Sequence, residues 1–152
     1  MEPRPQASEP APRSDTTPPV GEHGPLRVVI VEDSAIIRAR LEEALGEMDN
    51  LVLMGHAETE EEAMALLGRG RWDLLILDLQ LKHGNGLGVL KALRNGVNKA
   101  RGKVAVFTNY AFPQYRDRSL ALGADYFFDK ARELPRVLKL VADLATPSPA
   151  AA

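Results

Sequence analysis

The segment Leu74–Asp78, with the sequence LLILD, constrains the fold most strongly, because four large apolar residues run directly into a carboxylate. A short continuous apolar run is typical of a strand that is buried on both faces. An ionised carboxylate without partners is very costly away from water. We therefore expect Asp78 to lie at the open end of a buried strand, or beside a cation.

Comparable apolar segments recur along the chain and alternate with segments that have helical patterns. The strand-like segments are short and rich in β-branched or aromatic residues. Five strand–helix alternations predict an α/β fold, a doubly wound five-stranded parallel sheet with helices on both faces. The predicted strands are residues 26–31, 51–57, 73–78, 103–108 and 126–128.

Local signals mark where the helices begin. Ser34 is an expected N-cap, and Thr59–Glu62 has the pattern of a capping box, in which the first and last residues bond each other's backbone N–H. Proline is favoured in the first turn, so we expect helices to open at Pro113 and Pro135. The run Gly84–Gly88 predicts a loop that precedes another helix.

The two ends of the chain differ in composition from its middle. Residues 1–25 contain seven of the eleven prolines and almost no large apolar side chains. Such a segment cannot bury enough apolar surface to offset its ordering entropy, so we expect a disordered tail. We expect a second short disordered tail at residues 145–152 and one folded domain at residues 26–144, which is long enough to bury a core.

Composition and hydropathy exclude several classes of protein. There is no cysteine, which rules out disulfides and thiolate metal sites, and the formal net charge of −2 gives no field that would attract nucleic acid. No apolar run approaches the roughly 20 residues that a membrane-spanning helix needs, and the N-terminus lacks the apolar core of a signal peptide. We therefore expect a cytoplasmic protein without a membrane span.

Polar residues follow the predicted strands at the points where they end. Glu32 and Asp33 follow the first strand, Asp78 ends the third, Thr108 ends the fourth and Lys130 follows the fifth. Parallel strands bring these ends to one edge of the sheet, where ligands bind in such folds. Three clustered carboxylates repel one another unless one is protonated or a divalent cation is bound, and Mg²⁺ suits an all-oxygen site. A carboxylate beside Mg²⁺, a lysine and a hydroxyl is a phosphoryl-transfer constellation, in which the carboxylate can be the nucleophile.

These residues, in this order, resemble the receiver domain of two-component response regulators, and in particular its chemotaxis-regulator-like, stand-alone form. Gly86 in the loop after Asp78 and Gly123-Ala-Asp125 before the fifth strand also fit. The resemblance covers about residues 26–144 and implies the flavodoxin-like strand order 2-1-3-4-5. It further implies Mg²⁺, or Mn²⁺, as the cofactor.

The resemblance also implies a role for each matching residue. Asp78 looks like the phosphoacceptor, and the metal ligands would be the side chains of Glu32, Asp33 and Asp78 with the backbone carbonyl of Gln80. The residues that bind the phosphoryl group and switch with it would be Thr108, Lys130 and Phe127.

The chain departs from the family pattern at four positions. Phe127 lacks the hydroxyl of the usual Tyr, and Ala131 stands where the family usually has Pro. Asn109 replaces a commoner small residue, and Lys82 replaces a common Pro. None of these changes removes the phosphorylation chemistry.

The resemblance predicts a single-domain response regulator that accepts a phosphoryl group from a phosphohistidine donor onto Asp78. It would be a phosphoacceptor switch, with at most self-catalysed phosphoryl transfer and autodephosphorylation, and not an enzyme. Its partners would be a sensor histidine kinase or a histidine phosphotransfer protein, and a downstream protein. We expect that downstream protein on the face made by helix Pro113–Leu122, the fifth strand and the last helix.

Three other functions remain as alternatives at this stage. A receiver-like scaffold would bind partners without phosphorylation, which the full acidic set argues against. A Mg²⁺-dependent phosphohydrolase of the haloacid dehalogenase type would need a second Asp as general acid where Gln80 stands. A flavin or nucleotide binder would need a phosphate loop after the first strand, where Glu32 and Asp33 would repel phosphate.

Overall fold

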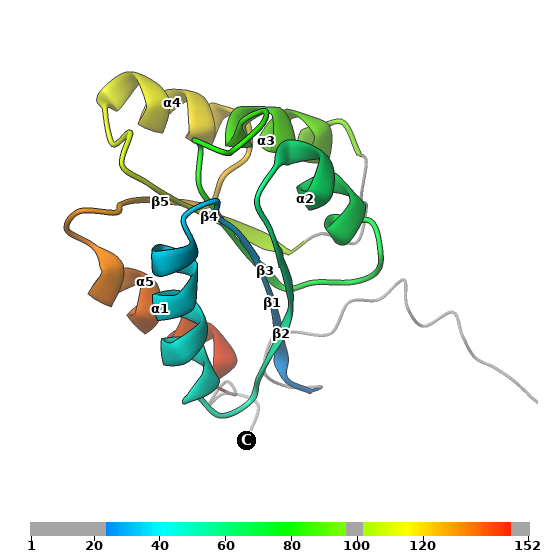
Figure 1. Cartoon of the computed structure of the whole chain (residues 1–152), viewed down its shortest axis with the longest axis vertical. Coiled ribbons are helices and arrows are strands. Elements are labelled where there is room, and N and C mark those ends of the chain that lie inside the picture. Colours follow the sequence, from blue (N-terminus) through cyan, green and yellow to red (C-terminus); the bar gives the residue numbers. More distant parts are fainter. Residues whose placement is uncertain (1–23, 97–101, 147–152) are drawn as a thin grey trace, which may run out of the picture.

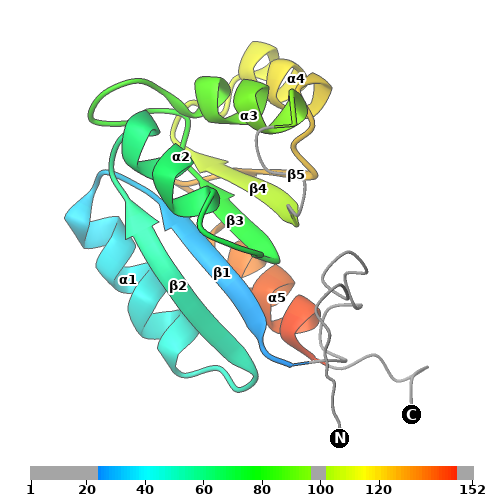
Figure 2. The ribbon, with the colours of Figure 1, turned by 90° about the vertical axis from the view of Figure 1, so that its right-hand side faces the viewer.

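The computed structural model describes residues 24–96 and 102–146, which form a five-stranded parallel sheet covered by helices on both faces (Figures 1 and 2). The strand order is β2-β1-β3-β4-β5, as predicted. The strands are β1 (Leu26–Val31), β2 (Leu51–Ala57), β3 (Leu74–Leu77), β4 (Lys103–Thr108) and β5 (Tyr126–Asp129). The helices are α1 (Ala35–Gly46), α2 (Glu60–Leu67), α3 (Gly86–Arg94), α4 (Pro113–Ala121) and α5 (Leu134–Ala145).

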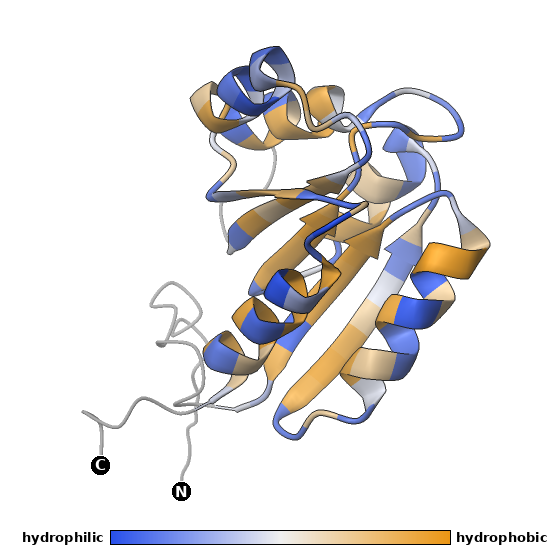
Figure 3. Ribbon diagram, turned by 90° about the vertical axis from the view of Figure 1, so that its left-hand side faces the viewer, coloured by the Kyte–Doolittle hydropathy of each residue, from blue (hydrophilic) through white to orange (hydrophobic). Residues whose placement is uncertain are grey.

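Each face of the sheet has its own apolar core. Helices α1 and α5 cover one face, while α2, α3 and α4 lie over the other (Figure 2). Strand β3 is buried at all four positions because it lies between β1 and β4 and is covered on both sides. The central strands are accordingly almost uniformly hydrophobic, whereas the helices are hydrophobic only on the side that faces them (Figure 3).

Strand β3 is shorter than the predicted segment 73–78, for a reason visible at each end. Asp73 lies just before the strand, where its carboxylate accepts a hydrogen bond from the backbone N–H of Arg27 at 2.8 Å. Asp78 lies just after the strand, although its own N–H still donates to the carbonyl of Val31 at 3.0 Å. Both acids are therefore end residues, and only the four apolar residues between them belong to the strand.

Two of the helix starts differ in detail from the prediction. Thr59 caps α2 by accepting from the N–H of Glu62, but the Glu62 carboxylate accepts from the N–H of Glu58 and not from that of Thr59. Gly86 and Gly88 lie inside α3 and not in a loop, since Asn85 caps that helix through the N–H of Gly88. The expected N-cap Ser34 is confirmed by its bond from the N–H of Ile37 at 3.3 Å.

Both glycines are closely approached by other atoms, but only Gly86 is approached by backbone, which cannot move aside. A Cβ at Gly86 would collide with the backbone carbonyl of Asp78, and one at Gly88 would collide with the carboxylate of Glu60. Helix α3 can therefore begin directly against the end of β3. This packing holds the start of α3 against the backbone of Asp78 and Leu79.

The predicted folded domain, residues 26–144, lies within the described residues apart from residues 97–101. Helix α5 begins at Leu134 and runs to Ala145, one residue beyond the predicted end of the domain. The two predicted tails fall almost entirely outside the described residues. Within residues 24–96 and 102–146, none of the helices combines the length and the apolar character needed to cross a membrane.

Candidate functional site

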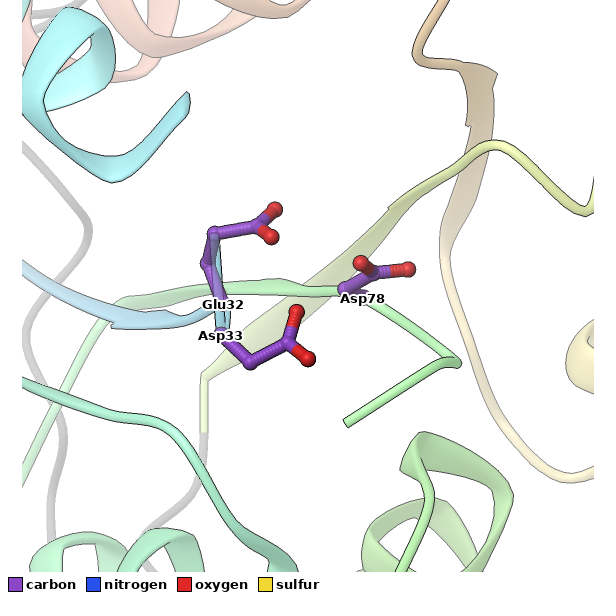
Figure 4. Close-up of side chains that lie close together, drawn as sticks. All are labelled: Glu32, Asp33 and Asp78. Atoms are coloured by element: carbon purple, nitrogen blue, oxygen red, sulfur yellow. The ribbon is translucent and has the colours of Figure 1, made fainter. Parts of the chain in front are cut away.

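Three carboxylates meet where β1 and β3 end. Carboxylate oxygens of Glu32, Asp33 and Asp78 all lie within 4.8 Å of one another, and Figure 4 shows the three side chains projecting into the same space. The strand pairing explains this meeting, because Val31 is in register with Leu77. The next residue on each strand is then an acid, so Glu32 lies beside Asp78. The convergence expected from parallel strands is therefore present.

Lys130 supplies the cation that Asp78 needs. Its Nζ lies 2.7 Å from Oδ2 of Asp78 and 2.8 Å from Oε1 of Glu32. All three groups are withdrawn from water, with Glu32 2% and Asp78 4% exposed as residues and the Lys130 side chain 7% exposed. Lys130 reaches this position because its backbone N–H donates to the carbonyl of Thr108 at 2.9 Å, which extends the pairing of β5 with β4 by one residue.

The electrostatics of this triad leave an excess of negative charge. Burial raises the pKa of Glu32, the hydrogen bonds from Lys130 and from the N–H of Ser34 offset part of that rise, and the neighbouring charge of Asp78 adds to it. Burial is the largest single influence and by itself would lower the pKa of Lys130, but the hydrogen bonds to Asp78 and Glu32 and the negative charges of these acids together outweigh it, so the pKa of Lys130 is raised. The ammonium is thus held firmly charged, whereas ionised Glu32 is disfavoured.

The remaining predicted residues surround the triad at different depths. Thr108 is fully buried, and its hydroxyl accepts from the N–H of Tyr110 at 3.0 Å. Gln80 is exposed, and its N–H donates to Oδ1 of Asp78 at 3.2 Å. Phe127 is half-buried and packs against the core beneath α2, α3 and α4. Asp33 is half-buried at the edge of the acidic cluster.

Two further charged residues border the site, and the sequence interpretation missed both. Arg38 Nη1 donates to the backbone carbonyl of Glu32 and to Oε2 of Glu58, each at 3.2 Å. Arg38 stands in the first turn of α1, where the helix dipole disfavours a cation. A cation at this unfavourable position is a sequence signal that the Arg38 side chain has an acidic partner outside the helix. Glu58 gives no such signal, because it was indistinguishable from the acids that open α2.

The arrangement suits a hard cation and a phosphoryl group. Carboxylate oxygens are the ligands that Mg²⁺ prefers, and an additional cation would relieve the repulsion among the three acids. An ammonium beside a carboxylate can neutralise the oxygens of a phosphoryl group bound to that carboxylate.

Fold and site together define a class of protein: a doubly wound α/β domain with an acidic cluster and a lysine at the carboxyl edge of its sheet. The family model for the response regulator receiver domain matches residues 28–142. The chain therefore belongs to the response regulator receiver domain family, which places it in two-component signalling.

Similar proteins share the fold over most of this chain. A gliding motility regulatory protein of Myxococcus xanthus is 31% identical over 124 residues, which are 80% of this chain but only 15% of that protein. The signal receiver domain of the putative response regulator NarL from Mycobacterium tuberculosis is 24% identical, with a TM-score of 0.72 over 80% of this chain and 97% of its own. A response regulator from Burkholderia pseudomallei, described with a phosphorylated aspartic acid, a calcium ion and citrate, is 20% identical, with a TM-score of 0.67 over 79% of this chain and 68% of its own.

Proposed function

We propose that this chain is a phosphoacceptor switch, which takes a phosphoryl group from a phosphohistidine donor onto Asp78 in a reaction that depends on Mg²⁺ or Mn²⁺. The observation that carries the proposal is the position of Asp78, which lies at a strand end between two other carboxylates and the ammonium of Lys130. This set of groups matches the chemistry of the family to which the chain belongs.

The transfer exchanges one bond for another at phosphorus. A carboxylate oxygen of Asp78 attacks the phosphorus, the P–N bond of the donor breaks and the P–O bond of an aspartyl-phosphate forms. The imidazole leaves with the electron pair of the broken bond and takes up a proton. Lys130 already contacts Oδ2 of Asp78, so its ammonium is within reach of an oxygen on the transferred group.

The divalent cation would be held by the side chains of Glu32, Asp33 and Asp78 and by the backbone carbonyl of Gln80. The donor set fits such an ion, because it contains only oxygen and carries more negative charge than Lys130 neutralises. When bound, the cation supplies positive charge that stabilises the phosphoryl oxygens during transfer. The acids of this chain orient it, and their mutual repulsion favours binding.

Thr108 and Phe127 would couple phosphorylation of Asp78 to a conformational change at the surface. The Thr108 hydroxyl now accepts from Tyr110, which leaves its own hydrogen free to be donated to a phosphoryl oxygen. Movement of Thr108 toward that oxygen opens space behind β4, into which the half-buried ring of Phe127 can turn. A charge-assisted hydrogen bond from Thr108 to the phosphoryl oxygen would form in only one of the two arrangements. It would therefore supply the free-energy difference that shifts the population between them.

The downstream partner would read the face made by α4, β5 and α5. A hollow of about 400 Å³ lies there and is lined from all three elements, among others by Arg116, Tyr126 and Arg136. A histidine kinase or a histidine phosphotransfer protein would supply the phosphoryl group at the carboxyl edge of the sheet, in the cytoplasm. Loss of the group by autodephosphorylation would reset the switch.

Intact-mass analysis after incubation with a small phosphodonor tests the proposal. With Mg²⁺ present we expect one acid-labile phosphoryl group on each molecule, and none when the cation is chelated. Absence of any phosphorylation, with the chain still folded, would favour the partner-binding scaffold. Continuous release of phosphate from monoester substrates would favour a phosphohydrolase.

A further inference from the structure

Arg38 binds the peptide group that joins the two acids after β1. Its Nη1 donates to the carbonyl oxygen of Glu32 at 3.2 Å, and that carbonyl belongs to the peptide whose N–H is on Asp33. Within the described part of the chain, the carboxylate of Asp33 itself has no hydrogen bond or ion pair to fix it. The direction of the Asp33 side chain therefore depends on how firmly its backbone is held, and Arg38 is a group that holds it.

Glu58 in turn holds Arg38. Its Oε2 accepts from the same Nη1 at 3.2 Å, so a single guanidinium nitrogen bridges the loop after β1 and the loop after β2. The Arg38 side chain is only 14% exposed, which shields this pair from the screening that weakens ion pairs at the surface. The N–H of Glu58 is bound by the carboxylate of Glu62, which fixes the loop from the other side.

Glu58 also contacts the loop that follows Asp78. Its backbone carbonyl accepts from the N–H of Lys82 at 3.1 Å, and its Oε1 lies 3.8 Å from Nζ of Lys82. Lys82 is two residues beyond Gln80, whose N–H binds Asp78. Glu58 thus connects the loop that carries the acid pair with the loop that carries Asp78.

We propose that Arg38 and Glu58 are positioning residues for the divalent cation, with Glu58 aiming Arg38 and Arg38 orienting Asp33. This inference rests on the proposed function, since it concerns how the same site binds its cation. Groups that hold metal ligands in place commonly change metal affinity when they are removed, although they do not touch the ion. Lys82 is 62% exposed and contributes less, because its ammonium is screened by water.

Titration of the unphosphorylated chain with Mg²⁺, followed by NMR of its backbone amides, tests this inference. Arg38→Met keeps the length and apolar stem of the side chain but removes the guanidinium. We expect its Mg²⁺ dissociation constant to rise roughly tenfold. Glu58→Gln should cause a smaller rise in the dissociation constant. The double variant should lose less Mg²⁺-binding free energy than the two single variants lose together, because Glu58 acts through Arg38.

Two matched controls separate positioning from a general change in charge. Arg40→Met removes a cation from an exposed position of the same helix, and Glu61→Gln removes an acid from an exposed position three residues after Glu58. Both controls should leave the dissociation constant within about twofold of the parent value, as for ordinary surface substitutions. Arg38→Lys, which keeps a donor, should fall between the parent and Arg38→Met.

Urea melts of each variant show that the chain remains folded. Equal Mg²⁺ affinity in Arg38→Met and the parent chain would overturn the inference, as would an equal loss in the Arg40→Met control. Because phosphate is absent from this titration, failure of the parent chain to accept a phosphoryl group would contradict the proposed function and leave the cation result standing. A parent chain that binds no Mg²⁺ would overturn both.

Discussion

The ammonium of Lys130 contacts the carboxylate of Asp78 directly, with 2.7 Å between Nζ and Oδ2. The same nitrogen lies 2.8 Å from Glu32, so one cation serves two buried acids. Strand ends that are far apart in the sequence are joined by this contact, since it links the end of β3 to the residue that follows β5. The site is consequently part of what holds the carboxyl edge of the sheet together.

Lys130→Met should therefore destabilise the cation-free chain. Removing one partner of a buried ion pair leaves uncompensated charge, and we expect a loss of about 3 kcal/mol in the free energy of unfolding. Urea melts in the presence of a chelator measure this loss. The control is Lys139→Met, whose exposed pair with Asp143 should be worth about 0.5 kcal/mol or less. Equal losses in the two variants would show that the buried ion pair contributes no more to stability than the exposed one.

The raised pKa of Glu32 predicts how its ionisation affects stability. When the folded-state pKa of an acid lies above its unfolded-state value, the folded state binds the proton more tightly. Stability should then fall as the pH rises from the unfolded-state pKa through the folded-state pKa of Glu32. Glu32→Gln, which cannot ionise, should lack this contribution. Urea melts of the parent chain and of Glu32→Gln at a series of acidic pH values measure this contribution as the difference between their free energies of unfolding. A difference that does not change with pH would contradict the prediction.

Gly86 is predicted to be indispensable for the geometry around Asp78. A Cβ there would meet the backbone carbonyl of Asp78 and the Cα of Leu79, neither of which can move aside as a side chain can. We expect Gly86→Ala to cost about 2 kcal/mol, in the range of overpacking in a well-packed core. The control is Gly46→Ala at the end of α1, where a Cβ meets nothing within 4 Å. A neutral Gly86→Ala would mean that α3 can shift away from the site.

Much of this fold was predictable because its strands are apolar runs with polar residues at their ends. The alternation of strands and helices, the parallel sheet and the meeting of Glu32, Asp33 and Asp78 follow from that pattern and from register. The strand order itself was implied by family resemblance and is confirmed. The roles assigned to the site residues remain predictions.

The errors arose where a tertiary contact decides the local structure. Gly86 and Gly88 have the composition of a loop, yet they begin a helix because its first turn packs against Asp78 and Glu60. Glu62 was expected to complete a capping box with Thr59, but it binds the N–H of Glu58. The bridge from Arg38 to Glu58 spans 20 residues and two loops, and no local pattern encodes it.

The response of Phe127 to phosphorylation can be followed directly. Its ring has no hydroxyl to satisfy, so its inward form leaves no buried polar group without a partner and should be appreciably populated even without phosphate. NMR with a beryllofluoride mimic should shift the signals of Thr108, of Phe127 and of the ring pair Tyr110 and Tyr115, whose centroids are 5.5 Å apart. Thr108→Val, which lacks the hydroxyl, should uncouple Phe127 from the mimic. A shift at Thr108 alone would mean that the signal leaves by another face.

The central claim is that Asp78 is the nucleophile, and intact-mass analysis of Asp78→Asn tests it most directly. The substitution keeps the shape of the side chain and removes the attacking carboxylate, while Asp117→Asn on the exposed side of α4 is the matched control. After incubation with a small phosphodonor and Mg²⁺, the parent chain and the control should each gain the mass of one phosphoryl group, and Asp78→Asn should gain none. Stoichiometric phosphorylation of Asp78→Asn would contradict the assignment of the site.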